Sequence, residues 1–228
     1  MDQAIGHGDI KAVLFDFDGT LWDPEPHIFS SYAEAFAENG STLLLEDWSE
    51  LIGTVGVDLW AHFEALSGGT VHRSQVEDGV RQRIAPLLAG VTLRPGVRRI
   101  LDAVDAASLP RGIVSNSDQS WIRHYSRQCG IDGGWAIVHC ADGDRSLAKP
   151  APILYRRAIA DLGIDAGDAI AFEDSPTGIR AATAAGIYCI AVPNVMTAAL
   201  DLRAADLRVD SFEEIEWQRL APGALLPS

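Results

Sequence analysis

Two aspartates, Asp16 and Asp18, are the residues whose types and spacing most directly suggest chemistry in this chain. They follow a short apolar run in the stretch VLFDFDGTLWD. Side chains two positions apart on an extended chain point the same way, so the two carboxylates come close together on one face. This placement costs Coulomb energy unless something nearby compensates it. The pair therefore raises the question of what compensates the two charges.

Three other groups of polar residues follow apolar runs and could share that site. They are Ser115 with Asn116, Lys149, and Glu173 with Asp174. Each group alone has an ordinary structural explanation: a strand-end cap, a solvated lysine and the acidic start of a helix. An isolated pair of aspartates after a strand is likewise commonly a turn or a helix cap. Together with the aspartate pair, these make four polar groups that follow four strands in order, and such an arrangement is hard to explain as four coincidences.

These groups must be positioned by strands, and the apolar runs predict where the strands lie. Five near-continuous runs indicate strands covered on both faces, as in a parallel sheet: residues 11–15, 111–115, 135–139, 169–172 and 187–192. Helical patterns lie between them, over 97–104, over 153–162, and from Ser175 to Gly186. This alternation predicts a doubly wound, mainly parallel α/β sheet.

The interval between the first strand and the helix near residue 97 is far longer than an ordinary connection. Apolar residues at helical spacing form three stripes in it: Ile28, Phe29, Tyr32 and Phe36; Leu59, Trp60, Phe63 and Leu66; Val76, Val80, Ile84, Leu87 and Leu88. A capping box at Ser74 and Glu77 predicts the start of the third helix. We therefore expect an α-helical cap domain, residues 22–94, inserted into an α/β core domain, residues 1–21 and 95–228.

The topology of such a sheet decides where the polar groups meet. In an open α/β sheet the ligand crevice lies outside the carboxyl ends of the strands, so all four groups fall at one edge. Carboxylate clusters without cysteine or histidine partners prefer a hard cation, and Mg²⁺ is the usual one. A cation, a lysine, a hydroxyl and helix N-termini together suit a phosphoryl group. One carboxylate can then be a nucleophile and another an acid and base.

The overall charge narrows the choice of partner. The chain has 228 residues and a net charge of −14, so it offers no electrostatic footprint for nucleic acid or an anionic membrane. A small anionic substrate stays compatible, because a metal and local donors can invert the field of a pocket. No apolar run has the length of a transmembrane helix, and three isolated cysteines suit reduced thiols. We expect a cytoplasmic location.

The motifs DFDGTL, SNS, KPAP and EDSPTGIRAATAAG, with a helical insertion after the first, resemble those of the haloacid dehalogenase superfamily. Within it, they resemble the branch of small phosphatases and β-phosphoglucomutase-like proteins that carries a helical cap. DFDGTL and EDSPTGIRAA are the specific signals, and the resemblance runs from about residue 11 to the last predicted strand. It implies a Rossmann-like core, Mg²⁺ as cofactor and a small phosphorylated metabolite as substrate.

The resemblance also implies roles for the acidic residues. Asp16 would be the nucleophile and form a phosphoaspartate, whereas Asp18 would protonate the leaving oxygen and then deprotonate the attacking water. Asp16 and Asp174, with Glu173 nearby and the main-chain carbonyl of Asp18, would hold Mg²⁺. The dehalogenases that name the superfamily carry no acid at the position of Asp18, so Asp18 favours phosphate-ester chemistry.

The remaining motif residues would handle the phosphoryl group. Ser115 and the main-chain N–H of Asn116 would bind its oxygens, and Lys149 would balance its charge. Gly19 and Thr20 would shape the turn that aims both aspartates. These roles are physically reasonable, because the charge that develops on the phosphoryl oxygens in the transition state would meet donors that are already in place.

Three functions stay open at this point: a phosphatase, a sugar-phosphate mutase, and a catalytically silent binding protein. Mutases of this branch carry an arginine in the specificity loop, where residues 52–58 of this chain offer Gly56 instead. They also use a histidine shortly after the first motif, and His27 falls one residue short of that place. Both departures favour hydrolysis. The intact pair of Asp16 and Asp18 argues against a silent protein.

Overall fold

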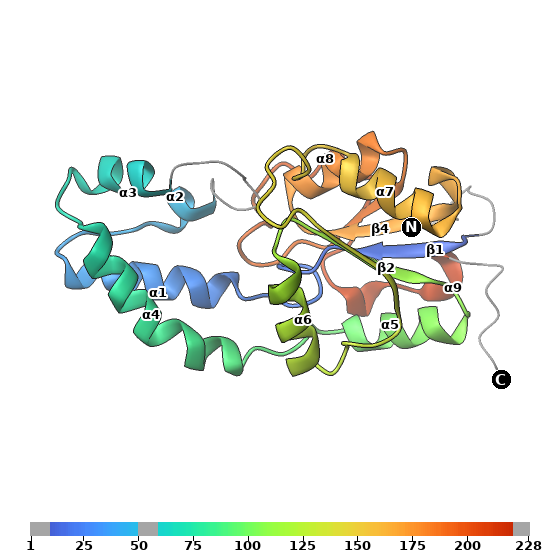
Figure 1. The fold of residues 1–228 in the computed structure, drawn as a ribbon, viewed down its shortest axis with the longest axis horizontal. Helices are drawn as coiled ribbons and strands as arrows, with labels where there is room; N and C mark the ends of the chain where they lie inside the picture. The colour runs from blue at the N-terminus through green and yellow to red at the C-terminus, as the bar shows by residue number, and fades with distance from the viewer. Residues whose placement is uncertain (1–9, 50–58, 221–228) are drawn as a thin grey trace.

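A computed structural model describes residues 10–49 and 59–220 of the chain. Within these residues, six parallel strands form one sheet in the order β3-β2-β1-β4-β5-β6 (Figure 1). They are β1 (Ala12–Phe15), β2 (Arg111–Ser115), β3 (Trp135–Cys140), β4 (Ala169–Glu173), β5 (Tyr188–Ala191) and β6 (Leu207–Arg208). The strand order reverses between β1 and β4, which is where doubly wound sheets bind ligands. The structure confirms the predicted α/β fold.

Helices cover both faces of the sheet. On one face lie α5 (Val97–Ala106), α6 (Gln119–Gln128), η2 (Phe212–Glu214) and α9 (Trp217–Leu220), and on the other α7 (Ile153–Leu162), η1 (Ala166–Asp168) and α8 (Pro176–Ala184) (Figure 1). β1 is fully buried: Val13 and Phe15 belong to the apolar cluster on one face, and Leu14 to the cluster on the other. This two-sided burial explains why the strand sequences are continuously apolar rather than alternating.

In the part of the chain that the structure describes, four helices lie between β1 and α5 and form a separate layer. They are α1 (Glu25–Glu38), α2 (Leu45–Ser49), α3 (Leu59–Ser67) and α4 (Arg73–Ala89), called the inserted helices below (Figure 1). They have an apolar cluster of their own. At its centre the ring of Phe63 lies 5.0 Å from that of Phe36 and 6.3 Å from that of Trp48. No helix in the described part of the chain has the length and apolar character needed to cross a membrane.

Two linkers, residues 22–24 and 90–95, join the inserted helices to the rest of the molecule, and they lie side by side. Trp22 pairs with Leu93 in an antiparallel bridge. The indole N–H of Trp22 donates to the carbonyl oxygen of Val91 at 3.2 Å. The main-chain N–H of Arg94 donates to the carbonyl oxygen of Leu21 at 3.0 Å. Any change in the orientation of the inserted helices therefore acts through these paired linkers.

The start of α4 differs from the prediction. His72 is its N-cap residue and makes no side-chain capping bond, so Ser74 lies inside the first turn and the predicted capping box is wrong. Glu77 instead forms an ion pair with Arg73, with 2.8 Å between Oε1 and Nε. Such a pair on an exposed helix face contributes only a few tenths of a kcal/mol. The helix depends more on the burial of Val76 and Leu88.

Candidate active site

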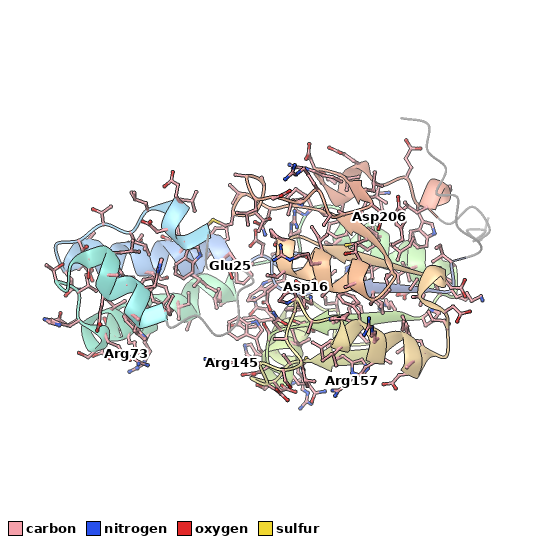
Figure 2. All side chains as sticks on the ribbon, turned by 90° about the horizontal axis from the view of Figure 1, so that it is seen from above. Asp16, Glu25, Arg73, Arg145, Arg157 and Asp206 are labelled. Atoms are coloured by element: carbon pink, nitrogen blue, oxygen red, sulfur yellow. The ribbon has the colours of Figure 1, made fainter. Side chains whose placement is uncertain are left out.

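A sharp turn after β1 places both aspartates of the DFDGTL motif at the carboxyl end of the sheet. The main-chain N–H of Asp16 donates to the carbonyl oxygen of Phe172 in β4 at 3.0 Å, which continues the pairing of β1 with β4. Gly19 then adopts a φ of +81°, and a β-carbon at this position would overlap the carboxylate of Asp174. Glycine therefore lets the turn close against the end of β4. Figure 2 shows Asp16 at the end of the core that faces the inserted helices.

Lys149 lies between two buried carboxylates. Its Nζ donates to Oδ1 of Asp16 at 2.6 Å and to Oε1 of Glu173 at 2.7 Å, and its side chain is only 3% exposed. The hydroxyl of Tyr155 donates to the same Glu173 oxygen at 2.5 Å. Burial lowers the pKa of Lys149, but the charges of Asp16 and Glu173 outweigh burial and raise the pKa above its ordinary value. The lysine therefore stays charged.

Asp174 adds a third carboxylate to this group. Its Oδ1 accepts a hydrogen bond from Thr20 Oγ1 at 3.2 Å, and its Oδ2 accepts one from Asn194 Nδ2 at 2.9 Å. Burial, reinforced by the charges of Asp16 and Glu173, raises the pKa of Asp174 well above its ordinary value. Three carboxylates beside one lysine leave an excess of negative charge that a metal ion would compensate.

The acidic cluster of Asp16, Glu173 and Asp174 fits a hard cation. One oxygen from each residue lies within 4.8 Å of the others, and all three residues are buried. Glu173 Oε2 is buried and has no hydrogen-bond partner. Buried polar atoms nearly always have a partner, and a bound cation would supply one. Carboxylate oxygens at this spacing are the donors that Mg²⁺ prefers. The residues present therefore suit Mg²⁺.

The side chain of Asp18 is held by a different set of donors. Ser117 Oγ donates to its Oδ2 at 2.5 Å, and the indole N–H of Trp121 donates to its Oδ1 at 2.8 Å. Burial raises the pKa of Asp18 to about 6. The two aspartates thus differ, because Asp16 is tied to a lysine and Asp18 to neutral donors. Such divergent surroundings suit different roles for the two carboxylates, with Asp18 the one that exchanges a proton.

Ser115 and Asn116, at the end of β2, lie next to the lysine. Asn116 Oδ1 accepts a hydrogen bond from the main-chain N–H of Lys149 at 2.8 Å. Ser115 is buried, and its Oγ accepts a hydrogen bond from the main-chain N–H of Ser117 at 3.1 Å. Asn116 therefore fixes the segment that carries the lysine. The structure brings every predicted site residue to one edge of the sheet.

Several residues that the sequence analysis did not single out contact this edge: Ser117, Trp121, Tyr155 and Asn194. Asn194 follows β5, so the strand-end argument could have found it. Ser117 stands two positions after Ser115 and could have been found in the same way. Trp121 and Tyr155 lie in helices, where no spacing distinguishes them from core residues.

Glu25, the first residue of α1, faces the site from the inserted helices (Figure 2). Its Oε2 accepts a hydrogen bond from the indole N–H of Trp48 at 3.2 Å. Burial, together with the negative charges of Asp18 and Asp23, raises the pKa of Glu25 to about 7. The interaction with Asp18 means that the first turn of α1 lies near the predicted acid.

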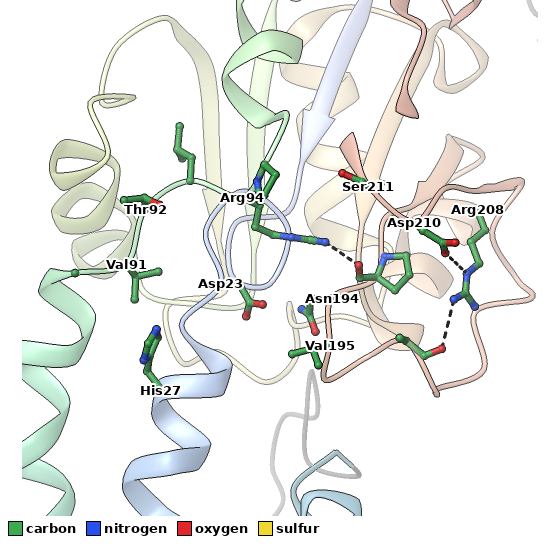
Figure 3. Close-up of a pocket in the computed structure, with 15 residues that line it drawn as sticks. Asp23, His27, Val91, Thr92, Arg94, Asn194, Val195, Arg208, Asp210 and Ser211 are labelled. Atoms are coloured by element: carbon green, nitrogen blue, oxygen red, sulfur yellow. Dashed lines mark hydrogen bonds and ion pairs between the residues drawn. The ribbon is translucent and has the colours of Figure 1, made fainter. Parts of the chain in front are cut away.

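A groove of about 680 Å³ lies beside the two linkers (Figure 3). Asp23, His27, Arg94 and Asn194 are among its lining residues. A guanidinium N–H of Arg94 donates to the carbonyl oxygen of Gly19 at 2.6 Å, so this groove adjoins the turn after β1 from outside the acidic cluster. His27, the histidine considered for a mutase, lines this groove. The specificity loop considered with it, residues 52–58, lies outside the described residues.

Gly178, in the first turn of α8, offers a direct test of how tightly Glu173 is held. A β-carbon there would overlap the Glu173 carboxylate. We expect Gly178→Ala to destabilise the protein by about 1–3 kcal/mol, the usual cost of overpacking, because the carboxylate cannot move without leaving Lys149. Urea unfolding measures the change. Gly133→Ala is the matched control, since nothing lies within 4 Å of a β-carbon at that position, and equal stability of the two variants would contradict the expectation.

Comparison with known proteins places this geometry in a family. A family model described as haloacid dehalogenase-like hydrolase matches residues 10–186. YhcW of Bacillus subtilis is 36% identical over 208 residues, which span 91% of this chain and 94% of YhcW. The phosphoglycolate phosphatase of Yersinia pestis is 28% identical over 190 residues, 79% of this chain and 80% of that protein.

A solved structure agrees with the sequence relatives. The crystal structure of a CbbY mutant from Rhodobacter sphaeroides in complex with xylulose-(1,5)bisphosphate superposes with a TM-score of 0.75 at 28% identity, covering 92% of this chain and 99% of CbbY. The family resemblance inferred from the motifs is thereby confirmed, as is the enzyme class, a hydrolase. The chain belongs to the haloacid dehalogenase-like hydrolase family.

Proposed function

We propose that this protein is a Mg²⁺-dependent phosphatase that hydrolyses a small phosphomonoester through a phosphoaspartate on Asp16. The observation that carries the proposal is the contrast between the two aspartates. Asp16 is hydrogen-bonded to a charged lysine within the acidic cluster, whereas Asp18 has neutral donors and a pKa raised to about 6 by burial. A nucleophile beside an acid and base requires this division of roles.

In the first half of the proposed reaction, an oxygen of Asp16 attacks phosphorus and the bond from phosphorus to the ester oxygen breaks. Asp18 gives its proton to that oxygen, so the product alcohol leaves neutral. In the second half, Asp18 takes a proton from water, and the oxygen of that water attacks phosphorus. Inorganic phosphate leaves and the Asp16 carboxylate is restored.

Fixed donors would stabilise the charge that moves onto the phosphoryl oxygens. Lys149, the Ser115 hydroxyl and the main-chain N–H of Asn116 fill this role in the proposal, and Gly19 and Thr20 keep the turn in place. Asp16 and Asp174, with Glu173 nearby and the main-chain oxygen of Asp18, would hold Mg²⁺. When bound, Mg²⁺ supplies positive charge at the phosphoryl group.

We also propose that residues 22–94 act as a cap domain over a core of residues 1–21 and 95–228. The inserted helices have their own apolar cluster and reach the rest of the chain through two paired linkers, which supports this division. Closure would exclude bulk water from the phosphoaspartate. The substrate would be a small phosphorylated metabolite, and the three free cysteines suit a cytoplasmic location.

Phosphate release from p-nitrophenyl phosphate and from a panel of phosphorylated metabolites tests the proposal. We expect turnover that rises with added Mg²⁺ and is lost in excess chelator, and that returns when Mg²⁺ is restored. Full activity in excess chelator would remove the metal from the mechanism. Isomerisation of a sugar phosphate in the presence of a bisphosphate primer, without net phosphate release, would instead establish a mutase.

A further inference from the structure

The two carboxylate oxygens of Asp18 have hydrogen-bond donors of different chemistry. Ser117 Oγ lies 2.5 Å from Oδ2, and the indole nitrogen of Trp121 lies 2.8 Å from Oδ1. A hydroxyl can donate or accept a hydrogen bond, depending on how it rotates. An indole N–H can only donate. The two oxygens of Asp18 are therefore not equivalent.

This difference decides which oxygen can carry the proton that goes to the leaving group. An oxygen that carries a proton accepts a hydrogen bond less well than a carbonyl oxygen does, so a proton on Oδ1 would weaken the bond from the Trp121 N–H. A proton on Oδ2 keeps that bond intact, and the Ser117 hydroxyl can rotate so that it accepts this proton until the ester oxygen takes it. We propose that Trp121 is a positioning residue that keeps the transferable proton of Asp18 on Oδ2. This inference rests on the proposed role of Asp18 as acid and base.

The indole of Trp121 is held in place by other rings. Its ring centroid lies 4.5 Å from that of Tyr125 and 5.8 Å from that of Trp22, both in edge-on contacts. Trp22 in turn stacks on Tyr125 at 4.0 Å and donates to the carbonyl oxygen of Val91 in the second linker. The N–H of Trp121 therefore cannot turn away from Asp18 without disturbing rings packed against both linkers.

Loss of this N–H leaves the Asp18 carboxyl free to rotate and to carry its proton on either oxygen. Proton transfer requires the arrangement with the proton on Oδ2. The bond from phosphorus to the ester oxygen breaks, the ester oxygen keeps its electron pair, and the proton moves from Oδ2 to that oxygen. Esters whose leaving group needs a proton should therefore be cleaved more slowly, and esters whose leaving group departs as a stable anion should be cleaved at nearly the native rate.

Trp121→Phe tests the inference with two substrates of the same shape. Phenyl phosphate releases a phenol with a pKa near 10, similar to that of tyrosine, whereas p-nitrophenyl phosphate releases a stabilised anion. We expect kcat/KM for phenyl phosphate to fall by about 10–100-fold, a part of what general acid catalysis contributes, and kcat/KM for p-nitrophenyl phosphate to fall by less than about 3-fold. The ratio kcat/KM covers only the steps up to the breaking of the ester bond, so the second half-reaction does not affect it.

Trp135→Phe is the matched control, because the Trp135 N–H donates to a main-chain oxygen, that of Ile131, from the edge strand β3. This control should leave unchanged the ratio of kcat/KM for phenyl phosphate to kcat/KM for p-nitrophenyl phosphate. Replacing Trp121 with benzothienylalanine, which keeps the ring shape and lacks the N–H, should reproduce the effect of Trp121→Phe even if phenylalanine disturbs the packing. Equal losses on both substrates in both Trp121 variants would overturn the inference.

Asp18→Asn separates this inference from the proposed function. If Asp18→Asn selectively lowers kcat/KM for phenyl phosphate while the Trp121 variants do not, the role of Trp121 is wrong and that of Asp18 stands. If Asp18→Asn leaves the ratio unchanged, the proposed acid and base is itself wrong. Ser117→Ala should change the ratio less than Trp121→Phe, because the indole N–H still keeps the proton on Oδ2. A larger effect of Ser117→Ala would also contradict the inference.

Discussion

Asp16→Asn should lower the rate of phosphate release by at least about 10⁴-fold, the scale seen when an enzyme loses its nucleophile. The amide keeps the shape of the carboxylate and retains an oxygen that can accept the Lys149 hydrogen bond, which is 2.6 Å long in the native protein. The fold should therefore survive. The variant loses the attacking carboxylate, so no acyl phosphate forms. Steady-state phosphate release and acid-quench trapping of radiolabelled phosphate on the protein measure both effects.

The matched control for this variant is Asp102→Asn, which makes the same substitution at an exposed position of α5. It should retain native turnover and native phosphate labelling. Intact mass measured on the assayed Asp16→Asn sample detects any reversion to aspartate by deamidation. Native turnover in a sample free of reversion would show that Asp16 is not the nucleophile.

The strand ends of the site were predictable because topology alone fixes them. Apolar runs mark strands that are covered on both faces, and parallel strands place their carboxyl ends at one edge. Asp16, Ser115 and Glu173 each stand at or just after the end of a predicted strand and lie at that edge. The hydrogen-bond partners of each side chain were not predictable, because they depend on side-chain orientation and on helices far away in the sequence.

Helix α6 shows why the rest could not be predicted. Its sequence is mostly polar, and Trp121, Ile122 and Tyr125 form only a short apolar stripe that packs against the sheet, so nothing distinguishes Trp121 from a core residue. Trp121 therefore gave no signal, although it contacts Asp18. Strand β6, Leu207–Arg208, has two residues, too few for a period of two to be recognised.

Lys149→Met should have the largest effect on stability. Lys149 is one of two lysines in the chain, and its removal leaves Asp16 and Glu173 buried without their shared cation. Removing one partner of a buried ion pair costs about 3–5 kcal/mol. The free energy of unfolding, measured by urea titration in the presence of chelator, should fall by this amount, and phosphate release should fall with it. Lys11→Met is the matched control, because the Lys11 side chain is 57% exposed and such surface pairs contribute little.

The destabilisation by Lys149→Met should depend on pH in a direction that the acidic cluster fixes. Burial raises the pKa of Glu173, and the lysine opposes this, so without Lys149 the folded protein holds a carboxyl whose pKa lies further above its unfolded value of 4.5. Such a group binds more protons in the folded state, so stability falls as pH rises from about 4.5 through the folded pKa. The variant should therefore lose most stability near pH 8 and least near pH 5, relative to the native protein at each pH. An equal loss at pH 5 and pH 8 would mean that the lysine does not lower the pKa of Glu173, and the proposed charge balance of the site would fail with it.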